Sequence, residues 1–246
     1  MHIVVTLAGH SRRFHAAGYA LPKCLIDIDG KPMIARVAEM FDPVRDHFHF
    51  VINSQQEHDF PQLPALLKTL AGRVSIAVIE PHESGPTFSA MQVTDVPAGE
   101  PVIIAYCDFK VVWDYAAFKR LVADADGAVP AFRGFHPASF GDTHYAYMRV
   151  DDAGRMLELR EKKSFTDARH EEFASAGLYY FRDWALFAHY AEQLQREGFG
   201  GMKEGYTSLL MNPMAADGLR VIVTEVEQFI CWGTPEDLAQ YAFWSA

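Results

Sequence analysis

The sequence predicts an α/β protein with three layers, in which helices cover both faces of a mostly parallel sheet and a β-rich insertion lies in the second half. Two patterns support this prediction. Up to residue 132, short apolar segments alternate with helical segments, which is typical of parallel strands joined by crossover helices. From residue 145, short segments alternate around turns instead, as in antiparallel hairpins. Half of the 246 residues are hydrophobic, so the chain can bury a sizeable core.

The first half opens with an apolar, β-branched run that predicts a buried strand. A polar, glycine-containing loop to residue 21 follows it, and the next short strand ends at an Asp-Gly turn. Pro32 and Pro86 are placed to open helices, and Asp114 is placed to cap one. The expected strands are 2–8, 24–28, 49–52, 74–79, 101–105 and 127–132, and the expected helices are 32–40, 63–70, 86–93 and 115–123.

In the second half, an Asp-Asp-Ala-Gly turn joins two alternating segments and predicts a hairpin. A further strand, a long helix, one more strand and a closing helix that begins at a proline follow. No repeat, low-complexity tract or linker divides the chain, so we expect a single domain over 1–246. The expected strands are 145–150, 156–160, 174–181 and 219–226, and the expected helices are 183–195 and 235–243.

The formal net charge of −10 limits the classes of partner. A nucleic-acid surface needs clustered Lys and Arg to replace the counterions of the phosphates, so the composition argues against one. A single nucleotide remains compatible with this charge, because a local pocket can be basic on an acidic protein. No apolar run approaches the roughly 18 residues that cross a bilayer, so no membrane partner is expected.

The cysteines and histidines do not form a recognisable metal motif. The three cysteines are far apart in sequence, which argues against a disulfide framework or a cysteine zinc site and favours a reducing cytoplasm. The 11 histidines are scattered, and no pair has the HExxH pattern. We therefore expect them to be surface or hydrogen-bonded imidazoles.

The loop after the first strand is the strongest functional signal. A loop at the carboxyl end of the first strand lies where open α/β sheets bind ligands. Its backbone N–H groups can surround phosphates, and Arg and Lys can add charge-assisted hydrogen bonds. Arg12, Arg13 and Lys23 lie in this loop of an otherwise acidic chain. Composition alone leaves a solvated basic loop open as the alternative.

The stretch LAGHSRRF…GYALPKCLIDIDGKPMI resembles the opening of the sugar-nucleotide pyrophosphorylase (nucleotidyltransferase) family, and in particular its small single-domain branch of surface-polysaccharide biosynthesis. The family opening reads roughly L-A-G-x-G-[ST]-R-F…P-K-x-L-x-x-x-x-G-K-P-M-I. The second loop glycine of the family is Ser11 here, and its Ser or Thr is Arg12. The residues that match in order are Gly9, Arg13, Phe14, Pro22, Lys23, Leu25, Gly30, Lys31, Pro32 and Met33.

This resemblance implies a Rossmann-like, GT-A-like nucleotidyltransferase fold, in which 1–132 mainly binds the nucleotide and 133–246 mainly binds the acceptor. In the family, the loop arginine and lysine grip the triphosphate and the transferred phosphoryl group, and these roles fall to Arg13 and Lys23. The rest of the loop then contacts the nucleotide through Leu7, Ala8, Gly9, Ser11 and Arg12.

Two later segments resemble the family in the same order. The segment HESGPT resembles the one that meets the base, which places Glu83, Gly85 and Pro86 at the nucleotide. The segment YCD follows a buried strand and resembles the family's N-x-D, which makes Asp108 the expected ligand of Mg²⁺. A carboxylate at the end of such a strand, facing phosphates, suits this hard cation.

Three segments of the second half resemble parts that the family uses for the acceptor. EKK ends a predicted strand, so Glu161 would meet acceptor hydroxyls or amines and Lys162 its phosphate; an exposed charge run is the alternative. AGLYYF matches x-G-x-Y-x-F, in which Gly177 would allow close contact with the acceptor. KEGYTS resembles N-x-E-Y-Y-x-S and makes Glu204 a further acceptor contact.

The segment CWGTPEDL matches the closing G-T-P-E-D-L of the family. Sugar-1-phosphate members often read D-x-G-T, with the Asp as second metal ligand, and Cys231 stands at that place. A neutral thiol is a poor Mg²⁺ ligand. Either Asp108, triphosphate oxygens and waters suffice, or Glu225 or Glu227 replaces the missing carboxylate. We favour the first account, since a regular strand would hold these glutamates about 13–20 Å from position 231.

The function implied is a Mg²⁺-dependent nucleotidyltransferase, of the cytidylyl or thymidylyl type, that couples a nucleoside triphosphate to a sugar-1-phosphate or another small phosphorylated acceptor and releases pyrophosphate. A non-catalytic nucleotide-binding homologue is the second hypothesis, supported by Ser11, Arg12 and Cys231. A glycosyltransferase on the related fold ranks third, because CDFK stands where those enzymes usually carry D-x-D. The base, the acceptor and the oligomeric state stay open.

Overall fold

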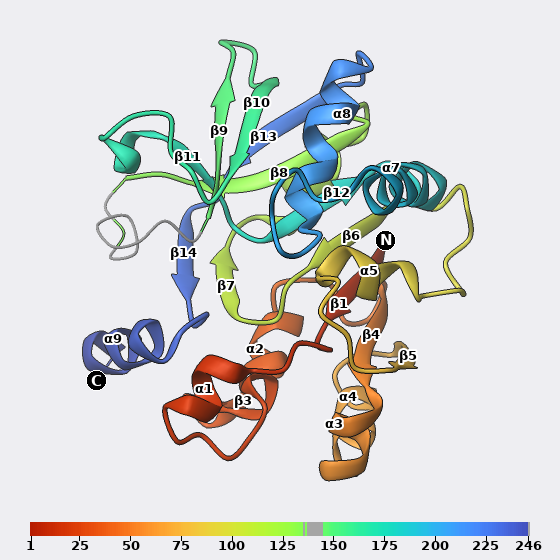
Figure 1. The fold of residues 1–246 in the computed structure, drawn as a ribbon, viewed down its shortest axis with the longest axis vertical. Helices are drawn as coiled ribbons and strands as arrows, with labels where there is room; N and C mark the ends of the chain where they lie inside the picture. Colours follow the sequence, from red (N-terminus) through yellow and green to blue (C-terminus); the bar gives the residue numbers. More distant parts are fainter. Residues whose placement is uncertain (135, 137–144, 246) are drawn as a thin grey trace.

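The computed structural model describes residues 1–134, 136 and 145–245. Its centre is a ten-stranded mixed sheet with the order β10-β9-β11-β8-β12-β6-β1-β4-β5, to which β13 adds by pairing with β8. Figure 1 shows this sheet crossing the molecule. Its strands are β1 (His2–Thr6), β4 (His47–Asn53), β5 (Arg73–Ile79), β6 (Val102–Ala105), β8 (Gly127–Phe132), β9 (Ala146–Val150), β10 (Met156–Glu161), β11 (Phe173–Ser175), β12 (Leu178–Phe181) and β13 (Val221–Glu225).

The first half of the chain forms the parallel part of the sheet. Strand β1 pairs in parallel with β4 and β6, and β4 pairs in parallel with β5. From β12 onward to β10 the pairings are antiparallel, and β13 returns parallel to β8. The mostly parallel core with a β-rich second part confirms the predicted fold class.

Helices cover both faces because alternate strand residues point to opposite sides. Ile3 and Val5 pack with α2, α4 and α6 on one face, whereas Val4 packs with α5, α7 and α8 on the other. Among the described residues, no helix is long and apolar enough to cross a bilayer. The helices are α1 (Arg12–Ala16), α2 (Met33–Ala38), α3 (Ser54–Asp59), α4 (Leu63–Lys68), α5 (Pro86–Met91), α6 (Tyr115–Leu121), α7 (Trp184–Glu197), α8 (Met211–Ala216) and α9 (Pro235–Ser245).

Several boundaries differ from the sequence prediction. The strand expected at 174–181 is two strands, because the chain turns at Gly177 with φ of +81°. The strand expected at 24–28 is a 3-10 turn at Lys23–Leu25 followed by β2 (Asp27–Ile28), which pairs with β3 (Lys31–Pro32). Helix α3 was not predicted, since its sequence SQQEHD has no apolar periodicity.

The C-terminal segment of the chain packs beside the first loop. Phe14, Met33 and Trp232 are buried together in a small core that also includes Leu238 of α9. Figure 1 shows α9 beside the N-terminal segment that carries α1. Because Phe14 is buried in this core, the core holds the loop after β1 in position.

Candidate active site

One cavity of about 670 Å³ lies at the carboxyl ends of β1 and β6. Its size is within the range of roughly 300–1,000 Å³ that is usual for small-molecule sites. Chain segments that lie up to about 230 residues apart in sequence meet around it. Its lining includes every site residue expected from the sequence: Leu7, Ala8, Gly9, Ser11, Arg12, Arg13, Lys23, Glu83, Gly85, Pro86, Asp108, Glu161, Lys162, Gly177 and Glu204.

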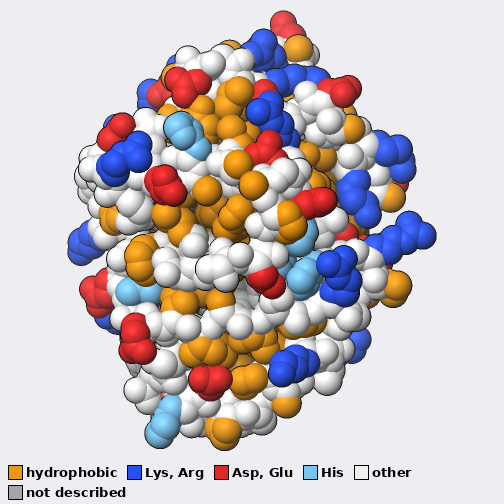
Figure 2. Space-filling model, turned by 90° about the vertical axis from the view of Figure 1, so that its right-hand side faces the viewer, with side chains coloured by type: hydrophobic (Ala, Val, Ile, Leu, Met, Phe, Trp, Pro, Cys, Tyr) orange, Lys and Arg blue, Asp and Glu red, His pale blue; other side chains and the backbone are white. Residues whose placement is uncertain are grey.

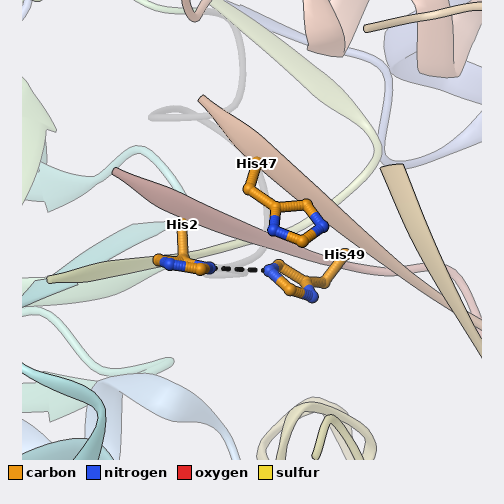
Figure 3. Close-up of side chains that lie close together, drawn as sticks. All are labelled: His2, His47 and His49. Carbon is orange, nitrogen blue, oxygen red and sulfur yellow. Dashed lines mark hydrogen bonds between the residues drawn. The ribbon is translucent and has the colours of Figure 1, made fainter. Parts of the chain in front are cut away.

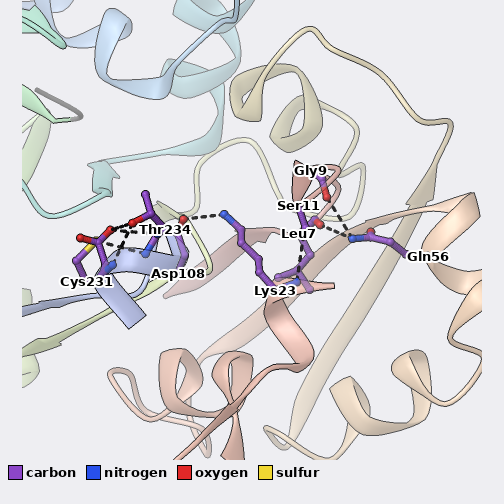
Figure 4. A network of polar contacts seen from close by, with 10 residues as sticks. Leu7, Gly9, Ser11, Lys23, Gln56, Asp108, Cys231 and Thr234 are labelled. Atoms are coloured by element: carbon purple, nitrogen blue, oxygen red, sulfur yellow. Dashed lines mark hydrogen bonds and ion pairs between the residues drawn. The ribbon is translucent and has the colours of Figure 1, made fainter. Parts of the chain in front are cut away.

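Helix α3 holds the loop after β1 in place. Asn53 caps α3 and forms a reciprocal pair of hydrogen bonds with Gln56, whose side chain accepts from the Asn53 backbone. The side-chain NH2 groups of both residues donate to the loop. Asn53 donates to the carbonyl of Ala8 and Gln56 to that of Leu7, both at 2.8 Å. Figure 4 shows Gln56 reaching the carbonyls of Leu7 and Gly9. The unpredicted helix therefore fixes the loop through the carbonyls of Leu7 and Ala8.

Ser11 takes the backbone conformation that the family's glycine permits. Its φ of 52° and ψ of 27° lie in the left-handed region, which costs a non-glycine residue about 1 kcal/mol. The Ser11 hydroxyl accepts a hydrogen bond from the Lys23 backbone N–H at 3.1 Å, which offsets part of that cost. The turn is thus retained despite the substitution. A Cβ placed on Gly9 would meet nothing within 4 Å, so this part of the loop faces open space.

Lys23 and Asp108 form an ion pair inside the cavity. Lys23 Nζ donates to Asp108 Oδ2 at 2.7 Å, and each side chain is only about a quarter exposed. Burial by itself would favour the neutral amine, but the Asp108 carboxylate outweighs it and raises the pKa of Lys23 above its ordinary value. Lys23 is therefore a fixed positive charge at the end of the parallel strands.

The loop arginines lie at the mouth of the same cavity. Arg12 forms an ion pair with Glu83, which joins the first loop to the segment that opens α5. About 70% of both side chains is exposed, so this pair is screened by solvent and contributes little to stability. Arg13 is exposed on the neighbouring turn of α1 and lines the cavity.

The groups around Cys231 determine which metal the site could hold. Burial raises the pKa of the Cys231 thiol, and the carboxylates of Asp237 and Asp108 raise it further, so the thiol is protonated. Cys231 Sγ donates to Asp237 Oδ2 at 3.4 Å. That carboxylate also accepts from the N–H and hydroxyl of Thr234, the residue before α9, whose hydroxyl oxygen in turn accepts from the Asp237 N–H. A hard carboxylate at Asp108 beside a protonated thiol fits a mostly hydrated Mg²⁺ better than a thiolate-bound metal.

The carboxylates proposed to replace the missing ligand do not share a strand with Cys231. Strand β13 ends at Glu225, and Cys231 belongs to the separate strand β14 (Gln228–Cys231), which pairs with β7 (Phe109–Val112). The regular strand assumed between these glutamates and Cys231 is therefore wrong. Glu225 instead accepts two hydrogen bonds from Arg133, at 2.9 and 3.1 Å. The carboxylate that approaches Cys231 is that of Asp237, six residues later in the chain.

A family model described as a MobA-like NTP transferase domain matches residues 3–173. The chain belongs to the MobA-like NTP transferase family. The predicted nucleotidyltransferase relationship is therefore confirmed.

Solved structures with the same fold cover nearly the whole of this NTP transferase. A nucleoside-diphosphate-sugar pyrophosphorylase from Vibrio cholerae RC9 is 17% identical, covers 98% of this chain and 99% of its own, and has a TM-score of 0.74. The inositol-1-phosphate CTP transferase from T. maritima is 12% identical over 99% of this chain and 94% of its own, with a TM-score of 0.72. HddC from Yersinia pseudotuberculosis is 14% identical, with a TM-score of 0.67 and nearly complete coverage of both chains. At these identities the likeness establishes the fold alone.

A curated relative matches over a short stretch. Protocadherin Fat 4 from Homo sapiens is 27% identical over 111 residues, which is 45% of this chain and 2% of the protocadherin. The chain therefore spans a small fraction of that protein's length. A match of this extent carries no inference about activity.

Two glycines of this NTP transferase are required by packing. A Cβ on Gly85, whose φ is +92°, would lie 2.6 Å from the backbone nitrogen of Gly205. A Cβ on Gly177 would lie 2.9 Å from the ring of Phe109. Both glycines line the cavity, but the position that a Cβ would occupy faces another part of the chain. Gly85 thus joins the segment that begins α5 to the segment that carries Glu204.

We expect Gly85→Ala to lower the free energy of unfolding by about 2–3 kcal/mol, because it adds backbone strain and a clash with main-chain atoms that cannot move aside. Gly218→Ala is the matched control, since Gly218 has a φ of +81° but open space around its missing Cβ. It should cost only about 1 kcal/mol for the backbone conformation. Urea denaturation followed by circular dichroism measures both. Equal losses would show that the contact with Gly205 is unimportant.

The second half of the chain supplies one wall of the cavity. Glu161 ends β10 and accepts a hydrogen bond from the hydroxyl of Ser208. Burial raises the pKa of Glu161, and the Ser208 bond and Lys162 offset this only in part. Lys162 has a φ of 57°, and its Nζ lies 4.2 Å from the centroid of the Tyr206 ring and donates to the Tyr206 hydroxyl. This wall combines a partly buried carboxyl group with a cation held on an aromatic face.

Sequence reasoning missed several lining residues, because isolated polar and aromatic side chains carry no pattern. Asp237 had a signal in the Thr-x-x-Asp spacing that begins α9, which is typical of a helix cap. Of the missed aromatic residues, Tyr179 is buried, and the others, Tyr106, Tyr145, Tyr206 and Phe229, are half-buried. The missed lining residues include His10, His82, Ser89, Tyr106, Tyr145, Ser175, Tyr179, Lys203, Tyr206, Phe229, Thr234 and Asp237.

Proposed function

We propose that this NTP transferase is a Mg²⁺-dependent cytidylyl- or thymidylyltransferase that couples a nucleoside triphosphate to a sugar-1-phosphate or another small phosphorylated acceptor and releases pyrophosphate. The observation that carries the proposal is the Lys23–Asp108 pair, 2.7 Å apart, in a cavity that also gathers the basic loop and the wall formed by the second half. Residues 1–132 bind mainly the nucleotide and 133–246 mainly the acceptor. The product would serve surface-polysaccharide precursors in the cytoplasm.

The proposed reaction is in-line attack by an acceptor phosphate oxygen on the α-phosphorus of the triphosphate. A bond forms between this oxygen and the α-phosphorus, and the bond between the α-phosphorus and the oxygen that bridges to the β-phosphate breaks. Pyrophosphate leaves with the electron pair of the broken bond. Arg13 and Lys23 stabilise the anionic oxygens, and positioning supplies most of the remaining rate. When bound by Asp108, Mg²⁺ would neutralise phosphate charge. No side-chain nucleophile is needed, so the protonated state of Cys231 is compatible with this chemistry.

Two kinds of finding support the proposal. The family match assigns the reaction class, and two solved structures of the same fold are named for a diphosphate-sugar pyrophosphorylase and a CTP transferase that acts on inositol-1-phosphate. The second kind of finding is the backbone conformation of Ser11. Because Ser11 takes the left-handed conformation that a glycine permits, the main reason for expecting a non-catalytic homologue is weakened.

Pyrophosphate release tests the proposal. The full chain is incubated with each of CTP, dTTP, UTP, ATP and GTP against a panel of sugar-1-phosphates, polyol phosphates and phosphocholine, with Mg²⁺ and with EDTA. At least one pair should release pyrophosphate only when acceptor and Mg²⁺ are both present. Tight triphosphate binding without release on any acceptor would favour the non-catalytic homologue instead.

Glu161→Gln and Glu204→Gln should each raise the acceptor KM about tenfold or more and leave the triphosphate KM nearly unchanged, because a carboxylate that binds hydroxyls or amines loses its charge. Glu227→Gln, which changes an exposed carboxylate away from the cavity lining, is the matched control and should alter neither constant. Steady-state kinetics with each substrate varied in turn separate the two constants. A shift confined to the triphosphate KM would place these residues in the nucleotide half.

Cys231→Asp should preserve activity and lower the Mg²⁺ concentration needed for half-maximal rate, since it adds a hard ligand where the family often has one. Glu225→Gln should leave the Mg²⁺ dependence unchanged, because Glu225 is paired with Arg133. Glu227→Gln should do the same. Mg²⁺ titration of the initial rate measures all three variants. A large rise in the Mg²⁺ requirement of Glu225→Gln or Glu227→Gln would mean that one of these glutamates is the replacement ligand after all.

A further inference from the structure

Three histidines come together at the amino-terminal edge of the sheet, opposite the cavity. His2 of β1 lies directly beside His47 of β4, and His49 follows two residues later on the same face of β4. Their rings lie within 5.4 Å of each other, centroid to centroid, and Figure 3 shows them turned toward one another. Hydrogen-bonded imidazoles were expected, but the sequence could not show that these three are neighbours, because β1 and β4 are 40 residues apart.

One carboxylate orients two of the three rings. Asp95 Oδ1 lies 2.9 Å from His49 Nδ1, and Asp95 Oδ2 accepts from the hydroxyl of Ser75. Because an ionised carboxylate only accepts hydrogen bonds, His49 must carry its proton on Nδ1. The Ser75 oxygen, whose proton is committed to Asp95, accepts from His47 Nε2 at 2.9 Å. His47 therefore carries its proton on Nε2.

This arrangement leaves a bare nitrogen on each of these two rings, on the side away from Asp95. His49 Nε2 is then a lone-pair acceptor and takes a hydrogen bond from His2 Nδ1 at 2.8 Å. An outer carboxylate that fixes the tautomers of inward-facing imidazoles is the usual surrounding of metal-binding histidines.

We propose that His2, His47 and His49 form a binding site for a divalent transition-metal ion such as Zn²⁺. One nitrogen from each ring lies within 4.8 Å of the others. Tetrahedral Zn²⁺ with bonds of about 2.0–2.1 Å requires nitrogens about 3.3 Å apart, which small ring rotations provide. His2 would carry its proton on Nε2 and turn its Nδ1 lone pair to the ion. Water or a neighbouring carboxylate completes the four ligands.

Two positively charged groups near the cluster oppose the binding of a cation: the Met1 ammonium beside His2, which forms an ion pair with Asp46 at 3.6 Å, and Arg73. The Arg73 guanidinium lies 3.4 Å from His47 Nδ1, but its side chain is exposed and can swing away into solvent. The carboxylates of Asp95 and Glu100 act in the opposite direction, since both raise the proton affinity of nearby rings and would attract a cation. On the face shown in Figure 2, acidic and basic side chains are interspersed.

The site is independent of the proposed catalysis. It lies at the start of β1, whereas the cavity lies at the end of that strand, about 15 Å away for five residues of strand. An ion held by residues of both β1 and β4 would link the two central parallel strands. Its binding should therefore raise the melting temperature, and the rise should grow with the logarithm of the ratio of free ion concentration to Kd.

Metal binding to the full chain tests the proposal. The protein is stripped with EDTA, dialysed, and titrated with Zn²⁺ by calorimetry and with Co²⁺ by visible absorption. We expect one equivalent of Zn²⁺ that Asp108→Asn retains, which separates this site from any metal in the active site. His47→Gln should weaken Zn²⁺ binding about 100-fold or more, and Asp95→Asn by about 10–100-fold. His58→Gln is the matched control, because His58 is an exposed imidazole outside the cluster.

Two outcomes would overturn the assignment. One is a wild-type chain that takes up no Zn²⁺ at micromolar concentration; the other is equal uptake by wild type and His47→Gln. Melting curves in EDTA show whether each variant is folded before it is titrated. If His47→Gln fails to fold, X-ray absorption of the Zn²⁺-loaded wild type decides, with three imidazole nitrogens expected and a carboxylate-only shell contradicting the site.

Discussion

Asp108→Asn should abolish pyrophosphate release while the chain stays folded. Asparagine has the shape of the aspartate but lacks the anionic oxygen that Mg²⁺ and Lys23 both prefer. It also removes the charge partner of Lys23 without leaving a space, so the packing around the end of β6 is retained. Initial rates at saturating Mg²⁺ measure the effect, and thermal melts measure the fold.

Asp114→Asn is the matched control for this substitution. Asp114 caps α6 by accepting from the Ala117 N–H at 2.8 Å, and asparagine caps a helix about as well as aspartate does. Its rate should stay at the wild-type level. Undiminished wild-type turnover in EDTA, or normal turnover of Asp108→Asn, would mean that no metal is held at Asp108.

Lys23→Ala and Arg13→Ala should each lose about 2–4 kcal/mol of transition-state stabilisation, which corresponds to a rate loss of about 30-fold to 1,000-fold. Lys23 should show the larger loss, because it is partly buried and held by Asp108, whereas Arg13 is exposed in the unliganded chain. Values of kcat/KM for the triphosphate measure the loss directly.

Lys31→Ala is the control for Lys23→Ala. Lys31 belongs to the same matched opening, but it forms a surface pair with Glu39 and does not line the cavity. Its removal should change kcat/KM by less than about twofold, as expected for an exposed ion pair. If Lys23→Ala and Arg13→Ala both kept the wild-type rate, the assignment of this loop to the triphosphate would be wrong.

Much of the fold could be predicted from the sequence because its signals are local. The apolar runs of β1 and β6, the prolines that begin α5 and α9, and the Asp114 cap each act within a few residues. The elements that were missed depend on distant partners. Helix α3 is stabilised by its capping box and by the loop that it contacts, and β14 exists because β7 pairs with it.

The site residues also divide into those with a local signal in the sequence and those that depend on distant segments. The matched opening and the later YCD segment placed Arg13, Lys23 and Asp108 at one cavity, as the structure has them. The turn between Glu225 and Gln228 could not be predicted, because a continuous strand-like sequence does not indicate which sheet each part of it joins. Clusters such as the three histidines are beyond sequence reasoning, because they depend on which strands are neighbours.

Transfer of a nucleotidyl group to a phosphorylated acceptor can be followed directly at the α-phosphorus. The full chain is incubated with Mg²⁺, an acceptor that supports pyrophosphate release, and the matching triphosphate labelled at its α-phosphate. The products are then separated, and their masses are measured by mass spectrometry. We expect the label in a single new species with the mass of the nucleoside monophosphate unit joined to the acceptor, formed one-to-one with unlabelled pyrophosphate and absent with Asp108→Asn. Label that remains in triphosphate, or that appears as free nucleoside monophosphate with no acceptor attached, would contradict the proposed function.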